Sequence, residues 1–121
     1  MFFQLILSLI MGGLLGLERE LKGKAAGLQT YSLVSLASCV FEILGLGSFV
    51  PVGIGFLGAG VISKKEENIF GLTTAAGLWL ASAIGVTIGK EKYLLSFFTT
   101  FLGLFVFLIL HFIERKIVKK N

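Results

Sequence analysis

The sequence has no aspartate, one cysteine, one histidine and one proline. A single cysteine, Cys39, allows no disulfide within the chain. With His111 as the lone imidazole, no group of histidines and cysteines is present that could hold a transition metal. No nucleophile, base and orienting group occur together either. The sequence therefore predicts a protein that is not an enzyme and that needs no cofactor.

Charged residues are also scarce, at 15% of the chain, whereas hydrophobic residues make up 55% and include 12 phenylalanines. A soluble domain of 121 residues could not bury that much apolar surface, so the composition predicts an integral membrane protein with the lipid bilayer as its main partner. The net charge of +4 comes from short basic clusters between apolar runs rather than from one basic face. Nucleic acid is therefore not an expected partner.

Four apolar blocks are visible, at 2–17, 28–62, 71–89 and 93–113. About 20 residues cross the hydrocarbon core, so the second block is too long for one crossing. The uncharged, turn-like stretch GLGSFVP from Gly45 to Pro51 divides it. We expect an all-α integral membrane protein with one domain over 1–121 and about five spans, at about 2–21, 28–46, 49–62, 71–89 and 93–113, the third short and glycine-rich.

The basic residues test this division, because short cytoplasmic loops collect lysine and arginine. With five spans and the N-terminus outside, only Lys90 and Lys92 of the 11 basic residues stay outside. A single span across 28–62 would at best divide them six against five. The predicted C-terminus is therefore cytoplasmic. The residues on that side are Arg19, Lys22, Lys24, Lys64, Lys65, Arg115, Lys116, Lys119 and Lys120.

Small residues recur at helical spacing in two of the spans. In the fourth span they occupy every fourth position, and Gly12 and Gly16 repeat the spacing in the first span. Such faces let helix backbones approach closely, so we expect these spans to pack inside and the fifth span to face lipid. The residues of the face in the fourth span are Gly77, Ala81, Gly85 and Gly89.

The third span carries four glycines, Gly53, Gly55, Gly58 and Gly60. The first three match a dinucleotide-binding fingerprint, but no strand precedes them and no acidic residue follows at the required distance, so nucleotide binding is not expected. Residues 49–62 make only about 21 Å of helix against a core of about 30 Å. Such a span either packs very tightly, which we favour, or is partly unwound and lines an ion or ligand site.

The stretch GLERELKGK from Gly16 to Lys24 closes a first apolar block of only about 24 Å of helix, which draws Glu18 to the edge of the hydrocarbon. In a continuing helix Glu18 would pair with Lys22, and Glu20 with Lys24. Spacing alone slightly favours an interfacial collar of salt bridges. The alternative is a carboxylate pair that binds a cation or docks a neighbouring helix.

Three further polar residues fall within or beside spans. Glu42 lies about one turn from the outer end of the second span, where a functional role and simple solvation are equally plausible. Thr73 and Thr74 open the fourth span, where their hydroxyls can cap the helix or bond to carbonyls one turn back.

Taken in order, GLERELKGKAAGLQTYSLV from Gly16, GIGFLGAGVI from Gly53 and GLTTAAGLWLASAIG from Gly71 resemble the three signature blocks of the MgtC/SapB family. The resemblance covers nearly all of the chain. It implies a small helical domain of about five spans in the bacterial inner membrane, in proteins associated with growth at low magnesium and with the survival of pathogens inside host cells. By position it marks Glu18, Arg19, Glu20, Gly27, Thr30, Gly53, Gly55, Gly58, Gly60, Gly71, Leu72, Thr73, Thr74 and Trp79.

The sequence also departs from the family pattern. Where the family commonly has Arg-Thr-His, this chain has Gln29, Thr30 and Tyr31, so a role that rests on that arginine or histidine is not expected here. Only ERKIVKKN follows the last span, so no C-terminal soluble domain is expected. With the family's Glu-Arg-Glu in view, a functional or partner-docking role for Glu18 and Glu20 is favoured over the collar.

These observations lead to two expectations about function. The resemblance implies a multi-pass regulator of a membrane complex such as ATP synthase, or of magnesium, phosphate or proton balance, that acts through helix contacts. The alternative is a transporter or channel for Mg²⁺ or another cation that uses Glu18, Glu20 and a broken third span, since Mg²⁺ prefers carboxylates. Which metal, if any, binds is not predicted. Five short spans enclose little volume, so a homo-oligomer is expected in either case.

Overall fold

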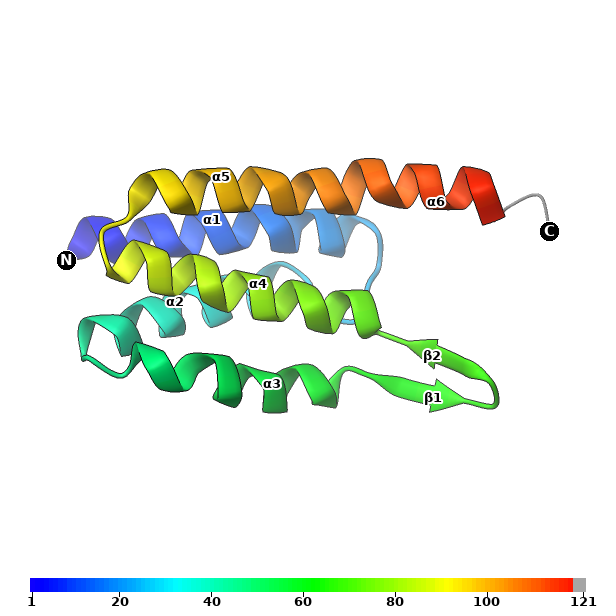
Figure 1. Cartoon of the computed structure of the whole chain (residues 1–121), viewed down its shortest axis with the longest axis horizontal. Helices are drawn as coiled ribbons and strands as arrows, with labels where there is room; N and C mark the ends of the chain where they lie inside the picture. The colour runs from blue at the N-terminus through cyan, green and yellow to red at the C-terminus, as the bar shows by residue number, and fades with distance from the viewer. Residues whose placement is uncertain (119–121) are drawn as a thin grey trace.

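The computed structural model describes residues 1–118 and consists mainly of α-helices that run up and down in one bundle (Figure 1). The predicted helical class is therefore confirmed. A short 3-10 helix precedes α3, and a π-helical turn, η2, joins α5 to α6. The elements are α1 (Phe2–Leu21), α2 (Leu28–Ile43), η1 (Gly47–Phe49), α3 (Val50–Gly60), β1 (Ser63–Lys65), β2 (Asn68–Phe70), α4 (Leu72–Gly89), α5 (Tyr93–Phe105), η2 (Val106–Leu110) and α6 (His111–Val118).

Three helical segments are long and apolar enough to cross a membrane, Phe2–Leu21, Leu72–Gly89 and Tyr93–Ile117. The last of these runs through α5, η2 and most of α6. Two shorter apolar helices, Leu28–Ile43 and Gly47–Gly60, lie in the other two predicted ranges. These lengths and compositions are those of a membrane protein. The number of crossings and the orientation stay predictions.

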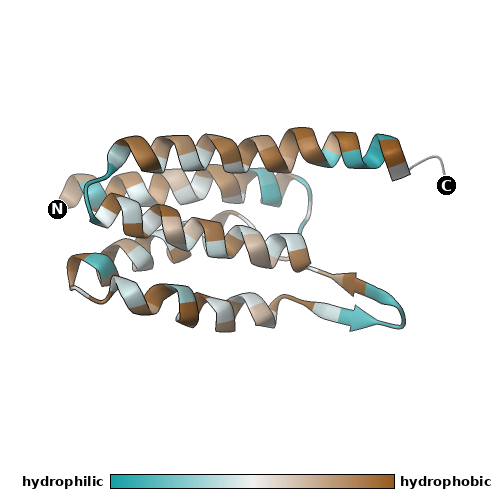
Figure 2. Ribbon diagram, in the orientation of Figure 1, coloured by the Kyte–Doolittle hydropathy of each residue, from teal (hydrophilic) through white to brown (hydrophobic). Residues whose placement is uncertain are grey.

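Strongly hydrophilic residues gather towards the two ends of the bundle (Figure 2). The C-terminal ends of α1 and α6 and the β hairpin lie at one end, and the turn from α4 to α5 lies at the other (Figure 1). The predicted cytoplasmic residues of the α1–α2 loop, the hairpin and α6 therefore lie together, opposite Lys90 and Lys92. Lys119 and Lys120, which were assigned to the same side, lie outside the described residues.

Helix α4 is the centre of the bundle, because it contacts α1, α2, α3 and α5. The side chains that are fully buried at these contacts are mostly apolar, as in any close-packed core. Helix α3 packs mainly on α4 and lies at the edge of the bundle (Figure 1). The largest fully buried side chains are Tyr31, Leu15, Leu78, Ile84 and Ile88.

Glycines allow α1, α2 and α4 to approach one another closely. A Cβ added at Gly12 would lie 2.5 Å from Cβ of Ser35, and one at Gly85 would lie 2.9 Å from Cβ of Ser38 and closer still to the Ser35 carbonyl. No side chain fits at such distances without moving a backbone. Because lipid is as apolar as the side chains, close packing of this kind is a main source of attraction between membrane helices.

The glycines of α3 differ from those of the other helices. A Cβ added at Gly58 would contact Ala75 of α4 at 3.5 Å, an ordinary contact distance, whereas at Gly53, Gly55 and Gly60 nothing in residues 1–118 beyond the local helix lies within 4 Å of that position. Among the described residues, α3 therefore meets α4 at Gly58, but without the close backbone approach found at Gly12 and Gly85.

Helix α3 is also continuous, so the unwound third span of the alternative expectation is absent from the structure. Pro51 in the first turn has a fixed φ that suits a helix start. In a bilayer the backbone of a glycine-rich segment has no water to bond, which favours its own helical hydrogen bonds.

Residues 63–70 form an antiparallel β hairpin that the sequence had not indicated, with Ser63 paired to Phe70 and Lys65 to Asn68. The hairpin leads into Gly71, which has a φ of +84° and precedes the first residue of α4. A Cβ at Gly71 would also overlap the Val61 carbonyl. Glycine is therefore needed here both for the left-handed backbone and for space.

Candidate functional site

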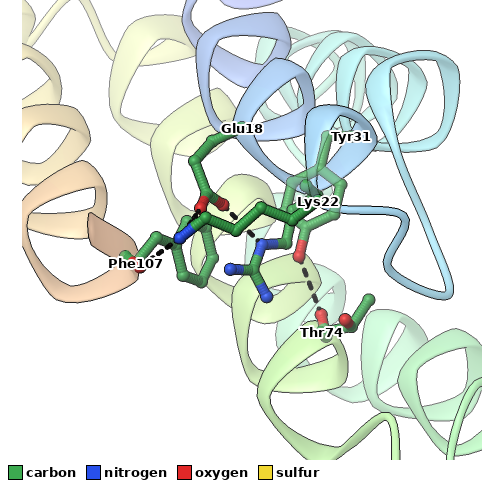
Figure 3. A network of polar contacts seen from close by, with 6 residues as sticks. Glu18, Lys22, Tyr31, Thr74 and Phe107 are labelled. Carbon is green, nitrogen blue, oxygen red and sulfur yellow. Dashed lines mark hydrogen bonds and ion pairs between the residues drawn. The ribbon is translucent and has the colours of Figure 1, made fainter. Parts of the chain in front are cut away.

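Glu18 lies near the end of α1 and is neutralised by Arg19 of the same helix and by Lys22, the residue that follows it (Figure 3). Its Oε1 accepts a hydrogen bond of 2.7 Å from Arg19 Nε, and its Oε2 is 2.9 Å from Lys22 Nζ. Glu18 and Arg19 are only 7% and 2% exposed. A carboxylate so deeply placed in an apolar bundle requires such partners, because an unpaired buried charge is very unfavourable.

The ion pairs are linked to the last helix through Phe107 in the π-helical turn η2. Lys22 Nζ donates a hydrogen bond of 3.4 Å to the Phe107 carbonyl (Figure 3). The Arg19 guanidinium lies over the Phe107 ring, 3.9 Å from its centroid, at a distance that suits a cation–π contact. Helix α1 and the π-helical turn η2 are thus held together by charge as well as by packing.

Tyr31 of α2 completes the arrangement. It is fully buried, and its hydroxyl donates a hydrogen bond of 3.0 Å to the Thr74 carbonyl of α4 (Figure 3). The Tyr31 ring packs edge to face against the Phe107 ring, and the two ring centroids are 6.5 Å apart. Gly77 makes room, since a Cβ there would overlap the Tyr31 hydroxyl. We call Glu18, Arg19, Lys22, Tyr31, Thr74 and Phe107 the Glu18 cluster; it joins α1, α2, α4 and η2.

Glu20 has a different role from Glu18. It is exposed, and its Oε1 accepts a hydrogen bond of 3.1 Å from the backbone N–H of Leu28, the first residue of α2. The expected pair with Lys24 is not among the ion pairs of residues 1–118. The physical reason is that α1 ends at Leu21 and Gly23 has a φ of +64°, so Lys24 is not one helical turn from Glu20.

This contact predicts a small, specific effect of substitution. Glu20→Ala removes the acceptor for the Leu28 N–H and is expected to lower the free energy of unfolding by about 1 kcal/mol. Glu20→Gln keeps an amide oxygen and is expected to lose less than half of that. Unfolding in increasing sodium dodecyl sulfate, followed by circular dichroism, measures both. Equal losses in the two variants would show that the charge matters rather than the acceptor.

Glu42 lies at the other end of the bundle, where its Oε2 is 3.1 Å from Lys90 Nζ. Gln4 is nearby in the fold and donates hydrogen bonds of 3.2 Å and 3.0 Å to the carbonyls of Ile88 and Gly89. These contacts join α1, α2 and the end of α4. Glu42 is therefore paired rather than free, and it does not meet the Glu18 cluster.

The remaining predicted residues are dispersed. Thr30 is exposed on α2, and Thr73 is exposed at the start of α4. Neither Thr73 nor Thr74 caps α4, because the N-terminus of this helix has no hydrogen bond from a side-chain cap. Thr74 contributes its carbonyl to the Glu18 cluster rather than its hydroxyl. Of the predicted site residues, the structure brings together Glu18, Arg19 and Thr74.

The Glu18 cluster connects four elements through contacts between residues of this chain. Glu18, Glu20 and Glu42 each contact a donor of this chain, and residues 1–118 contain no group of three or more His, Cys, Asp or Glu side chains placed for a metal ion. Sequence reasoning missed Phe107, one of 12 phenylalanines with nothing local to distinguish it. It noted Tyr31 only as a departure from the family pattern, and that position was the available signal.

Comparison with known sequences relates this chain to one family of proteins. Residues 5–116 match the MgtC family. The chain is 35% identical to "Putative magnesium transporter YhiD" of Escherichia coli strain K12, over 98% of this chain and 64% of that protein. It is 33% identical to SrpB of Synechococcus elongatus, over 84% of this chain and 70% of that protein. It is 43% identical to MgtC of Brucella abortus, over 66% of this chain and 38% of that protein.

The chain thus spans about two thirds or less of several of the curated relatives that it matches, with 64% of YhiD and 38% of the Brucella MgtC covered. No solved structure matches it.

Proposed function

We propose, from the premise that this chain belongs to the MgtC family, that it is a multi-pass protein of the bacterial inner membrane that modulates another membrane protein in magnesium homeostasis. The modulation takes place through helix contacts within the bilayer. The family and the apolar helices support the membrane location. The link to magnesium rests on the name of the E. coli relative.

The observation that carries the proposal is that the buried carboxylate of Glu18 is already paired with cations of this chain. Glu18, the most deeply placed acid, has a cation within 3 Å of each of its oxygens, at 2.7 Å and 2.9 Å. A Mg²⁺ ion would have to displace Arg19 or Lys22 to reach it, leaving a buried cation without its partner. A path for ions lined by this carboxylate is therefore disfavoured, whereas a rigid bundle that presents a surface to a partner is favoured.

Helix α3 offers that surface. Val52 and Phe56 are 81% and 84% exposed, and Gly53 and Gly55 between them have open space where a side chain would stand. Beside them, an apolar groove of about 420 Å³ is lined by Phe41 and Leu46 together with residues of η1 and α3. A glycine-bearing groove suits a transmembrane helix better than flexible lipid chains, because backbones can approach closely there.

Crowding this surface tests the proposal. Gly53→Leu with Gly55→Leu is expected to leave the fold intact and to reduce the recovery of partner proteins from mildly solubilised membranes at least fivefold, with weaker growth at low magnesium. Ala83→Leu, an exposed small residue on α4, is the matched control. If both variants retain the same partners as the unmodified chain, the α3 surface is not the contact. Loss of only self-association would identify a second copy as the occupant.

A second candidate function is supported by the name of the E. coli relative, which describes a magnesium transporter. It is tested by Mg²⁺ entry into liposomes that carry the purified protein and a magnesium-sensitive dye. A modulator gives no entry above empty vesicles. Entry that Glu18→Gln abolishes would replace the proposal with transport.

A further inference from the structure

A basic cleft lies where the end of α1 meets η2 and α6. It consists of two adjoining cavities, of about 280 Å³ and about 440 Å³, which share Lys24 and His111. Arg19 and Thr73 line the first cavity, and Lys22 and Arg115 line the second. We call Arg19, Lys22, Lys24, Thr73, His111 and Arg115 the basic cleft. It lies at the end of the bundle that is predicted to be cytoplasmic.

Positive charge in the cleft exceeds what the neighbouring acids neutralise. Glu18 is shared by Arg19 and Lys22, so one negative charge faces two positive charges. Glu114 is the one carboxylate among the lining residues. Within residues 1–118, neither Lys24 nor Arg115 has a carboxylate oxygen within 4 Å. The cleft is therefore attractive to an anion.

Arg19 gives the cleft a fixed donor. Its side chain is 3% exposed, and the bond to Glu18 uses Nε alone, so the two terminal amino groups of the guanidinium take no part in it. Phe107 supports the guanidinium from the ring side. A guanidinium held rigidly in this way binds phosphate oxygens with less loss of entropy than a mobile lysine does.

The cleft is also apolar on its outer side. Leu108 and Phe112 line the second cavity, Val106 and Leu110 line the first, and all four side chains are exposed. Inorganic phosphate gains nothing from such neighbours. A phospholipid gains apolar contacts from them, because its acyl chains can lie along the exposed face of η2 and α6 while its phosphate contacts the cations.

We propose that the basic cleft is a binding site for the phosphodiester headgroup of an anionic phospholipid in the cytoplasmic leaflet. Arg19, Lys24 and Arg115 contact the phosphate oxygens, the Thr73 hydroxyl donates a hydrogen bond, and Leu108, Leu110 and Phe112 contact the acyl chains. Basic pockets at this depth between membrane helices recognise anionic headgroups. The site concerns lipid rather than a protein partner, so it stands whether or not the modulating role does.

Short-chain lipids test the site with the full chain. Dioctanoyl phosphatidylglycerol, dioctanoyl phosphatidylcholine and inorganic phosphate are titrated separately against the purified protein in a non-ionic detergent, and bound molecules are counted by native mass spectrometry. Phosphatidylglycerol is expected to bind at least tenfold more tightly than either of the others. Lys24→Gln with Arg115→Gln is expected to reduce the affinity for phosphatidylglycerol about thirtyfold, since each cation near an anionic headgroup contributes roughly a factor of five.

The matched control is Lys64→Gln with Lys65→Gln, which removes the same charge at the same end of the bundle but in the hairpin. It is expected to keep full affinity. Equal losses of affinity for phosphatidylglycerol in the two double variants would show that the lipid is attracted by the overall positive charge of this end of the bundle and not by the basic cleft. That result would overturn the proposal. Binding of inorganic phosphate as tight as that of phosphatidylglycerol, unchanged by Leu108→Gln, would overturn the lipid assignment in favour of free phosphate.

Discussion

Gly85→Leu is expected to prevent the bundle from reaching its native packing. A Cβ at Gly85 would overlap the Ser35 carbonyl and approach Cβ of Ser38 to 2.9 Å. The obstacle is therefore the backbone of α2, which cannot turn aside as a side chain can. Overpacking usually costs about 1–3 kcal/mol where side chains can yield, so we expect more than about 3 kcal/mol here.

Unfolding in sodium dodecyl sulfate measures this loss, with the fluorescence of Trp79, the one tryptophan, as the probe. Trp79 is half exposed and donates a hydrogen bond of 3.3 Å to the Pro51 carbonyl of α3, so its emission reports whether α3 stays docked on α4. Ala83→Leu places the same side chain on an exposed position of the same helix and is expected to change stability by less than about 0.5 kcal/mol. A stable Gly85→Leu variant would mean that α2 and α4 are not packed as described.

Glu18→Gln is expected to have the next largest effect. It leaves Arg19, which is 2% exposed, without a negative partner, and it removes the ion pair that places Lys22 at the Phe107 carbonyl. Removing one partner of a buried ion pair costs about 3–5 kcal/mol. Because glutamine still offers an oxygen to Arg19 Nε, we expect a loss of about 3 kcal/mol.

Unfolding in sodium dodecyl sulfate also measures this loss of stability, and two further variants serve as controls. Glu67→Gln removes a carboxylate from the exposed hairpin turn and is expected to be neutral. Glu18→Gln with Arg19→Gln removes both charges and is expected to recover about half of the stability, since neither is then left alone. Growth at low magnesium is scored in parallel. A fully stable Glu18→Gln variant with impaired growth would contradict a purely structural cluster and favour direct action of Glu18.

Much of the helical arrangement could be predicted from the sequence. The lengths of the apolar blocks predicted where the helices lie, because each crossing of a bilayer needs a minimum number of apolar residues. The turn near Gly45 divided the longest block into two helices. The pairing of Glu18 with Lys22 followed from helical spacing. The pairing of Glu20 with Lys24 did not form, because it depended on the last turn of α1, and helix ends are the least predictable part of an element.

The rest of the candidate site depends on contacts that no local pattern encodes. Phe107 lies 88 positions from Arg19 in the numbering, and the two meet only because α5 and η2 return along α1. The hairpin at 63–70 has strands of three residues, too short for an alternating pattern. The spacing of the four glycines of α3 does not tell which of them face a neighbouring helix, and only the fold shows that three of them have no contact at the Cβ position among residues 1–118.

The length of α3 has a consequence for the surrounding lipid. Residues Gly47–Gly60 make about 21 Å of helix beside a hydrocarbon core of about 30 Å, and this segment lies at the edge of the bundle. Lipids next to it must shorten, or the helix must tilt, at a fraction of a kcal/mol per Å of mismatch. A partner helix that covers α3 removes this boundary. Under the proposed contact at α3, membrane thickness controls how strongly the partner helix associates, and thicker bilayers favour the assembled state.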